Sequence, residues 1–475
     1  MSQIKNHMNL LPQICFWGCL TALLTICFYF LVHNAWWIIG DEAIVVSHTG
    51  MGKAFSPLGF SEMPITGRLY PFAYNLYNVL LLFNDGYISP QAHYILQAIA
   101  LCIFGLFFAL IGLHILKDKP SVWKYSITFC LVAIAVVRVL NEFITCYTGV
   151  WIVFMFLPIF MYCAIQFEET ENWSFGIIVL LTINYITYCY EIVCTIPFAI
   201  GVCSLIFNYR NLSRNKKIFN YLLIAGSVLF LSIWALAILP QTTNFYSHKE
   251  EASHLMNALK FFVAQKIYWL AVIALIVRVV QIVSKRSEYS FYDSLLLASF
   301  ACFLGTAILK LNFTYYYNIG SLVALVPILY FAKEYMKPHW VCLLFALLTI
   351  FYGRKYPAII QKSQTDRVSS RTQITELAEM SKTTQLYWYA PYFEDQQVLW
   401  ADVRNCQRGR LETIMHWYMQ NEDVQIIEKE EYDASLTGVW LFPCENEKLF
   451  PEMEMPEIAG EMIMDTGGVK GYKVE

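Results

Sequence analysis

Charge is scarce in this sequence. Charged residues make up 15% of the chain, whereas a soluble domain contains about 25%. Hydrophobic residues make up 57%, and the mean hydropathy is +0.47. This composition excludes an ordinary soluble protein. The formal net charge of −3 provides no basic excess of the kind that nucleic-acid-binding proteins carry, so no nucleic-acid partner is expected.

Motifs typical of several other protein classes are also missing. The 14 cysteines include no C-x-x-C pair or other zinc-site spacing. Most of them lie inside apolar runs, where Cys behaves as a small hydrophobic residue. The chain contains no internal repeat and no low-complexity stretch. The first apolar run has no A-x-A cleavage pattern and is longer than a typical signal-peptide core, so we expect an uncleaved signal anchor.

Long apolar runs dominate the sequence instead. About 20 apolar residues cross a bilayer, and these runs are continuous rather than alternating, which indicates helices rather than a barrel. The predicted fold class is an all-α polytopic membrane protein of about eleven transmembrane helices, followed by a small C-terminal α/β soluble domain. The predicted spans are 14–39, 93–116, 122–140, 149–166, 174–190, 191–208, 218–239, 261–283, 293–310, 315–333 and 338–353.

The basic residues orient these spans. With the N-terminus inside, the inner loops contain 11 Lys and Arg in 33 residues, whereas the outer loops contain five in 89. This bias follows the positive-inside rule. It requires residues 69–83 to be an interfacial helix, because an extra span there would invert every later loop. The N-terminus is therefore predicted to be cytoplasmic. The inner basic residues are Lys117, Lys119, Lys124, Arg210, Arg214, Lys216, Lys217, Lys285, Arg286, Lys333 and Lys337.

The end of the chain differs from the rest in charge. Residues 354–475 carry 13 basic and 21 acidic residues, whereas residues 1–353 carry 20 and 15. We therefore predict a transmembrane domain over 1–353, with an outer loop at 40–92, and an acidic extracytoplasmic domain over 354–475. Its only cysteines are Cys406 and Cys444, for which one disulfide or two free thiols both fit the sequence.

Hydrophobic patterning predicts mixed secondary structure in this C-terminal domain. Period-3.6 patterns indicate helices at 366–382 and 409–420. Short runs rich in aromatic and β-branched residues indicate strands at 386–392 and in the segments VQIIEK and TGVWLFP.

The first span leads into an acidic pair, Asp41 and Glu42, directly after Gly40. Trp36 and Trp37 match the aromatic belt of a membrane interface, which places the pair at the water boundary. A carboxylate there can act as a general base toward an acceptor hydroxyl, or help to hold a divalent cation such as Mg²⁺ or Mn²⁺. The alternative is a charged helix end that only marks the boundary.

The outer loop that follows contains two further candidates. Arg68 follows Gly67 and precedes the predicted interfacial helix. Its planar guanidinium can pair with the acidic residues or bind a phosphate, and an interfacial anchor is the alternative. His48 lies in the same loop, and long loops without secondary structure are often functional.

Two more candidates lie at predicted outer helix ends. Glu191 interrupts the apolar stretch YITYCYEIVCTIP at a turn between two helices. A carboxylate there is costly unless it faces a cavity or a partner, and a structural hydrogen bond is the alternative role. Lys310 precedes the aromatic cluster FTYYYN, where it either meets a lipid phosphate or snorkels toward water.

Other charged residues in the spans have plainer explanations. Arg138 and Glu142 are four residues apart, which predicts a salt bridge within one helix. Arg278 lies near an inner helix end and is predicted to snorkel. The stronger candidates all lie on the outer face, which implies a site at the outer membrane–water boundary.

Several short motifs together resemble the GT-C class of membrane glycosyltransferases. The first helix ends in an acidic pair, GDE at 40–42, and the outer loop closes in a Gly-Arg followed by an amphipathic helix, GRLYPFAYNLYNVLLL. An aromatic-glycine segment, CYTGVWIVFMFLP, leads into a helix, and a Tyr-x-Glu, YCYEIV, lies at an outer helix turn. Related families often have His before this Glu, where the present chain has Tyr190.

This resemblance implies transfer of a sugar from a polyprenyl-phosphate donor to a glycan or lipid acceptor, at the outer face of a bacterial inner membrane. The first-loop acidic residue is the usual catalytic candidate of the class, so the role of base falls on Asp41 first and Glu42 second. Arg68 and Lys310 would stabilise the departing lipid phosphate. Glu191 and His48 would contact substrate. The lack of a glycine-rich phosphate loop fits a site that needs no soluble nucleotide.

Other functions fit the same topology. A flippase or transporter of lipid-linked sugars would have midplane polar residues, broken helices and pseudo-repeats. A non-catalytic membrane scaffold would bind a partner through its outer tail, and its acidic pair would be dispensable. A polymerase or ligase of lipid-linked glycans would also use a long outer loop. Substitution of Asp41 separates catalysis from the scaffold.

Overall fold

A computed structural model gives the fold of the chain. It describes residues 2–37, 69, 71–82, 89–144, 149–238, 240, 251–309, 314–390, 408–409, 411–419, 421, 424–443, 456–466 and 469–475. Among the predicted site residues, Glu191 is described. The other five, and both cysteines of the C-terminal domain, lie outside these ranges: Asp41, Glu42, His48, Arg68, Lys310, Cys406 and Cys444.

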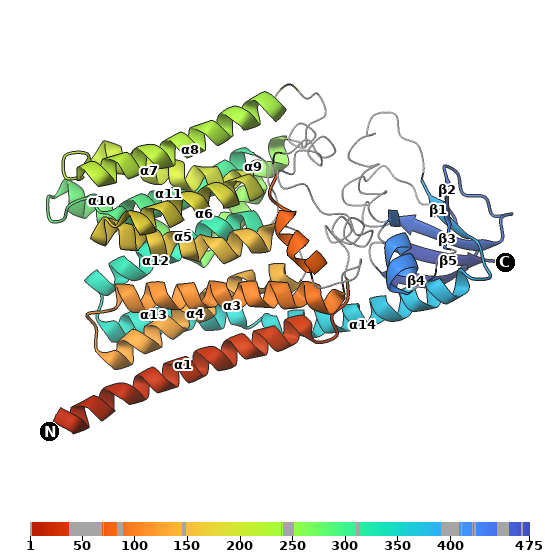
Figure 1. The fold of residues 1–475 in the computed structure, drawn as a ribbon, viewed down its shortest axis with the longest axis horizontal. Coiled ribbons are helices and arrows are strands. Elements are labelled where there is room, and N and C mark those ends of the chain that lie inside the picture. Colours follow the sequence, from red (N-terminus) through yellow and green to blue (C-terminus); the bar gives the residue numbers. More distant parts are fainter. Residues whose placement is uncertain are drawn as a thin grey trace.

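The apolar runs form long helices that lie side by side in a bundle (Figure 1). Ten helices among the described residues are long and apolar enough to cross a membrane, and α6 is a shorter apolar helix of 17 residues. The predicted polytopic all-α fold class is confirmed. The bundle helices are α1 (Ser2–Val32), α3 (Pro90–Ile115), α4 (Ser121–Ile144), α5 (Val150–Thr170), α6 (Trp173–Cys189), α7 (Thr195–Asn208), α8 (Arg214–Ile238), α9 (Glu251–Ala264), α10 (Lys266–Val283), α11 (Phe291–Ile308), α12 (Thr314–Tyr335) and α13 (Pro338–Gly353).

The C-terminal domain lies at one end of this bundle, joined to it by the long helix α14 (Tyr356–Met380) (Figure 1). We call this end of the bundle the sheet end and the opposite end the far end. The N-terminus of α1 lies at the far end (Figure 1). The short 3-10 helix η2 (Asn75–Leu82) is at the sheet end and is too short to span a membrane, in agreement with the prediction that this segment is not a span.

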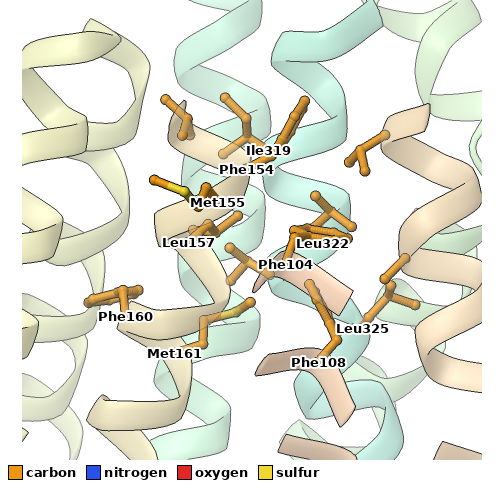
Figure 2. Close-up of a cluster of buried hydrophobic side chains, with 14 of the residues drawn as sticks. Phe104, Phe108, Phe154, Met155, Leu157, Phe160, Met161, Ile319, Leu322 and Leu325 are labelled. Carbon is orange, nitrogen blue, oxygen red and sulfur yellow. The ribbon is translucent and has the colours of Figure 1, made fainter. Parts of the chain in front are cut away.

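The core of the bundle is packed with large apolar side chains from α3, α5 and α12 (Figure 2). Phe104 and Phe108 on α3 are fully buried, as are Phe154 on α5 and Leu322 on α12. Lipid is as apolar as these side chains, so close packing rather than exclusion of water holds the helices together. The result is a rigid support for the segments at the sheet end.

Charged residues at the far end are paired across helices. Lys117 lies 2.9 Å from Glu169, and Lys216 lies 2.9 Å from Glu168. The acidic segment at 167–173 therefore balances the basic loops beside it. Arg278 was predicted to snorkel, but this prediction is wrong. Its side chain is buried and forms a bidentate pair with Asp293 at 2.7 and 2.8 Å, so its charge is neutralised inside the protein.

A five-stranded sheet with the order β2-β1-β3-β5-β4 forms the C-terminal domain. Strand β1 pairs in parallel with β2 and β3, whereas β5 pairs antiparallel with β3 and β4. The first three strands were predicted, and β4 and β5 were not. The strands are β1 (Leu386–Tyr389), β2 (Ile426–Lys429), β3 (Gly438–Pro443), β4 (Glu461–Thr466) and β5 (Val469–Val474).

The predicted helices of this domain differ in extent from those observed. The helix expected at 366–382 begins ten residues earlier, as α14, and ends at Met380. Within the segment expected to be helical at 409–420, the structure describes a helical turn at 411–413 and a π-helix, η4 (Ile414–Tyr418). Helix α14 packs on the sheet beside β4, where Gln373 accepts a hydrogen bond from the Asp465 amide at 2.9 Å.

Trp36 and Trp37 are buried between the end of α1 and the C-terminal domain. They are 1% and 2% exposed, and they share a hydrophobic cluster with Leu377 of α14 and Trp388 of β1. The predicted position in a membrane aromatic belt is therefore wrong. The helix ends earlier than expected, at Val32, and the chain beyond it turns into the core of the second domain.

Candidate functional site

Segments that are far apart in sequence meet at the sheet end. The amide of Phe72 donates to the carbonyl of Tyr188 at 3.1 Å, and the thiol of Cys189 donates to the carbonyl of Phe72 at 3.5 Å. The chain just after Gly67-Arg68 is thus bonded to the end of α6. The Tyr190 ring lies 5.5 Å from the ring of Tyr316, near the start of α12. Three motifs noted in the sequence therefore lie together: the segment after Gly67-Arg68, the YCYEIV turn and the aromatic cluster FTYYYN.

Gly149 connects a fourth motif to the same place. It precedes α5 with a φ of +75°, a left-handed conformation that favours glycine. A Cβ atom at this position would lie 3.0 Å from Ala73 Cβ and 3.0 Å from the Tyr190 ring. The glycine of the CYTGVW segment thus allows the first outer segment and the Tyr-x-Glu turn to approach each other.

Glu191 lies at the turn where it was predicted. Helix α6 ends at Cys189, Tyr190 is extended, and Glu191 begins the 3-10 helix η3 (Glu191–Cys194). The Glu191 side chain is 2% exposed. Leu69, the residue after Arg68 in the sequence, is fully buried in a cluster that contains Cys194. The Gly-Arg motif therefore leads directly into the surroundings of the Glu191 turn.

A buried polar row fixes η2 against the bundle. His93 of α3 lies 2.9 Å from the Gln97 amide nitrogen, and its ring stacks on Tyr77 of η2 with centroids 5.3 Å apart. Trp151 of α5 donates from Nε1 to the Tyr77 hydroxyl at 2.7 Å. The sequence reasoning did not identify this row, although a His and a Gln four residues apart in an apolar helix are a signal for it.

The outward side of η2 borders a depression of about 330 Å³. Its floor is tied to the bundle, because the Tyr185 hydroxyl of α6 donates to Asn75 Oδ1 at 2.8 Å. Leu82 at the end of η2 is 79% exposed. An exposed apolar residue beside amide side chains suits the boundary between lipid and water. The depression is lined by Asn75, Leu76, Asn78, Val79 and Tyr185.

Arg138 and Glu142 do not form the predicted salt bridge within α4. Both side chains instead contact Asn318 of α12, which accepts from the Arg138 guanidinium and donates to Glu142 Oε1 at 2.9 Å. Asn318 also donates to the backbone carbonyl of Arg138 at 3.0 Å. One amide therefore binds both charged groups, and the cluster joins α4 to α12 below the candidate site.

The described part of the sheet end contains two buried carboxylates, Glu142 and Glu191. No group of three or more His, Cys, Asp or Glu side chains that could hold a metal ion occurs among the residues that the structure describes. Glu142 is bound to Asn318, so Glu191 is the carboxylate beside which the segment after Arg68, the start of α5 and the end of α6 meet.

No protein-family model and no curated protein matches the chain. Among solved structures, it is similar to the crystal structure of ArnT from Cupriavidus metallidurans in the apo state. The TM-score is 0.48 and the identity 8%, over 97% of this chain and 98% of that one. It is also similar to ArnT bound to undecaprenyl phosphate, with a TM-score of 0.44 and 9% identity over 96% and 97% of the two chains.

Proposed function

We propose that this chain is a membrane glycosyltransferase that moves a sugar from a polyprenyl-phosphate donor to a glycan or lipid acceptor. The observation that carries the proposal is the meeting of four motifs at one end of the bundle. The segment after Arg68 bonds to the end of α6, Gly149 lies against both, and Glu191 begins the adjoining turn. A site at a helix-bundle end is reached by a lipid-linked donor from the membrane and by an acceptor from water.

The distribution of charge supports an extracytoplasmic position for this site. The 11 basic residues predicted for the inner loops lie near the helix ends at the far end of the bundle. By the positive-inside rule the far end and the N-terminus are cytoplasmic, and the sheet end faces outward. We therefore propose that in a bacterium the protein lies in the inner membrane, with the C-terminal domain outside the cytoplasm.

Asp41 is the proposed general base. It accepts the proton of the acceptor hydroxyl while the hydroxyl oxygen attacks the anomeric carbon of the donor. The bond between that carbon and the phosphate oxygen breaks, and the polyprenyl phosphate leaves with the electron pair. Arg68 and Lys310 stabilise the negative charge that develops on the leaving phosphate. The proton on Asp41 then passes to water.

Three other residues complete the proposed site. Glu42 is the second carboxylate of the pair, and His48 and Glu191 orient the substrates. The oxygens of Asp41 and Glu42 are of the ligand type that Mg²⁺ and Mn²⁺ prefer, so these residues would hold a divalent cation that the reaction required. Such a cation would offset the charge of the donor phosphate.

Placement of the buried charges argues against a transporter. A transporter of this kind binds its substrate near the bilayer midplane, at broken helices. In the described part of the chain, the buried charged side chains of the bundle lie near helix ends instead. They are Arg138, Glu142, Glu191, Arg278 and Asp293.

The test is complementation of a deletion strain with Asp41→Asn, with the surface and lipid-linked glycans analysed by mass spectrometry. We expect glycans one sugar short and a rate lower by about 10²–10⁴-fold, because the base is lost while the shape is kept. Glu430→Gln, at an exposed position of the C-terminal domain, is the matched control and should leave the glycan complete. A complete glycan with Asp41→Asn, at normal membrane levels, would reject the assignment and favour a scaffold.

A further inference from the structure

Helix α14 carries a fully buried arginine, Arg367, where three helices meet. Its Nη1 donates to the carbonyl of Leu31 at 2.8 Å and to those of Phe30 and His33 at 3.3 Å each. Its Nη2 donates to the carbonyl of Ile144 at 3.4 Å. A side chain from the C-terminal helix therefore binds the ends of two bundle helices at once.

The ends of α1 and α4 supply the compensation that this buried cation needs. Both helices finish at this point, at Val32 and Ile144, and their last carbonyls have no partner within the helix. These carbonyls are the negative ends of the helix dipoles. No carboxylate in the described part of the chain pairs with Arg367, so helix ends take the place of a counter-ion. The planar fork of arginine presents five donors in a fixed geometry, which suits bonds to several carbonyls at once.

Arg367 also begins a contact row that reaches η2. Its guanidinium lies 4.0 Å above the ring centroid of Tyr94, whose hydroxyl donates to the Ile144 carbonyl at 3.5 Å. The Tyr94 ring lies edge-to-face with His93 at 5.5 Å, and His93 stacks on Tyr77 of η2. Packed aromatic and charged groups therefore connect α14 to the segment that follows Arg68.

From these contacts we infer that Arg367 is a positioning residue for the proposed glycosyl transfer. It holds the end of α1, which leads to Asp41 and Glu42, in register with η2, which follows Arg68. It acts through α1 and Tyr94 rather than on the substrate. The inference rests on the proposed function and adds a role for the C-terminal domain. Its helix α14 sets the spacing between the end of α1, which leads to Asp41 and Glu42, and η2, which follows Arg68.

A second anchor at the same helix end makes the inference testable in a folded protein. Gln364, one turn before Arg367, donates to the Phe30 carbonyl at 2.9 Å. Trp36 and Trp37 pack in the C-terminal core through apolar contacts of their own. Substitution of Arg367 therefore loosens the end of α1 without removing its other contacts.

The experiment compares Arg367→Lys and Arg367→Met with wild type in the purified full-length chain and in the complemented strain. Hydrogen exchange is measured for residues 30–37 and 71–82. We expect exchange in both segments to rise by about tenfold or more, because bonds to a charged group are lost. The glycan-forming rate should fall by about 100-fold, as expected for misplaced reacting groups. Exchange in β1 and β3 should not change.

Two further variants complete the set. Lys362→Met changes an exposed basic residue on the same helix and should alter neither exchange nor glycan. Gln364→Leu removes the hydrogen bond to the Phe30 carbonyl and leaves Arg367 with all of its partners. This variant should raise hydrogen exchange at residues 30–37. Unchanged exchange in Arg367→Lys, Arg367→Met and Gln364→Leu would overturn the inference.

Asp41→Asn, tested in parallel, separates the two proposals. A complete glycan with Asp41→Asn rejects the proposed function. A truncated glycan with Asp41→Asn, together with a complete glycan in both Arg367 variants, rejects only the role of Arg367.

Discussion

Gly149 shows how a single residue shapes the candidate site. Its left-handed φ of +75° begins α5, and its missing side chain leaves room for Ala73 and Tyr190. A left-handed conformation costs an ordinary residue about 1–2 kcal/mol. Both properties of glycine, its freedom at positive φ and its small size, are therefore used at the same position.

Gly149→Ala tests this dual role. The added methyl group meets backbone strain and two contacts at 3.0 Å, so we expect a loss of at least about 1–2 kcal/mol and a lower temperature of half-unfolding in detergent. Gly353→Ala is the control, because nothing lies within 4 Å of a Cβ atom at that helix end. Equal stability of the two variants would contradict the strained geometry at Gly149.

At the scale of elements, the end of α1 and the residues that follow it (30–37) contact both the helix bundle and the C-terminal domain. The helix ends in the bundle, and the tryptophans that follow it pack against α14 and the sheet. Helix α14 in turn reaches back and bonds to the last carbonyls of α1 through Gln364 and Arg367. Each element therefore supports the other.

Trp36→Ala tests the coupling between these elements. Removing a buried tryptophan costs about 3–5 kcal/mol, and here the lost contacts join the C-terminal domain to the bundle. We expect trypsin to cleave the C-terminal domain of this variant faster, while the bundle helices remain resistant.

Trp340→Ala serves as the control, because Trp340 is 52% exposed on α13 and is not in the hydrophobic cluster that the described residues of the C-terminal domain form. Wild-type resistance of Trp36→Ala to trypsin would show that the segment after α1 does not hold the C-terminal domain in place.

At the scale of the whole molecule, charge is divided between the two ends. The far end carries the basic loops, with part of their charge balanced by Glu168 and Glu169, whereas the C-terminal domain is acidic. A membrane protein with this distribution keeps its basic end in the cytoplasm.

Reporter fusions test the resulting orientation. Alkaline phosphatase fused after Glu475 should be active, because the enzyme folds outside the cytoplasm, and phosphatase fused after Lys285 should be inactive. Green fluorescent protein at the same two positions should give the opposite pattern. Phosphatase activity only at the Lys285 fusion would reverse the proposed topology and move the site to the cytoplasmic face.

The fold was largely predictable because its main signal is local. A continuous apolar run predicts a membrane helix without knowledge of its neighbours, and the helices α3 to α8 and α10 to α13 lie close to the predicted spans. Helix α9 was not predicted, because most of it lies in the segment 240–260 that was expected to be an outer loop. Strands β4 and β5 were missed, although Gly467-Gly468 between two short runs is a hairpin signal. Their short, partly charged sequences become strands because β5 pairs with β3 and β4 pairs with β5.

Several residue roles could not be predicted because they depend on distant partners. Arg138 and Glu142 have the spacing of a helix salt bridge, yet each bonds to Asn318 on α12. Trp36 and Trp37 have the sequence context of a membrane belt, yet they are buried in the C-terminal core. Local spacing describes one helix, whereas these contacts form between helices.

The sequence by itself determined the membrane class, the approximate spans, the charge asymmetry and the candidate motifs, since each depends on composition or spacing along one segment. Only the tertiary structure decided that Gly149, Tyr190 and the segment after Arg68 lie together, and that Arg367 binds the ends of α1 and α4. The reason is physical. A buried charge or a close backbone contact is stable only when groups far apart in sequence compensate it, and the fold brings those groups together.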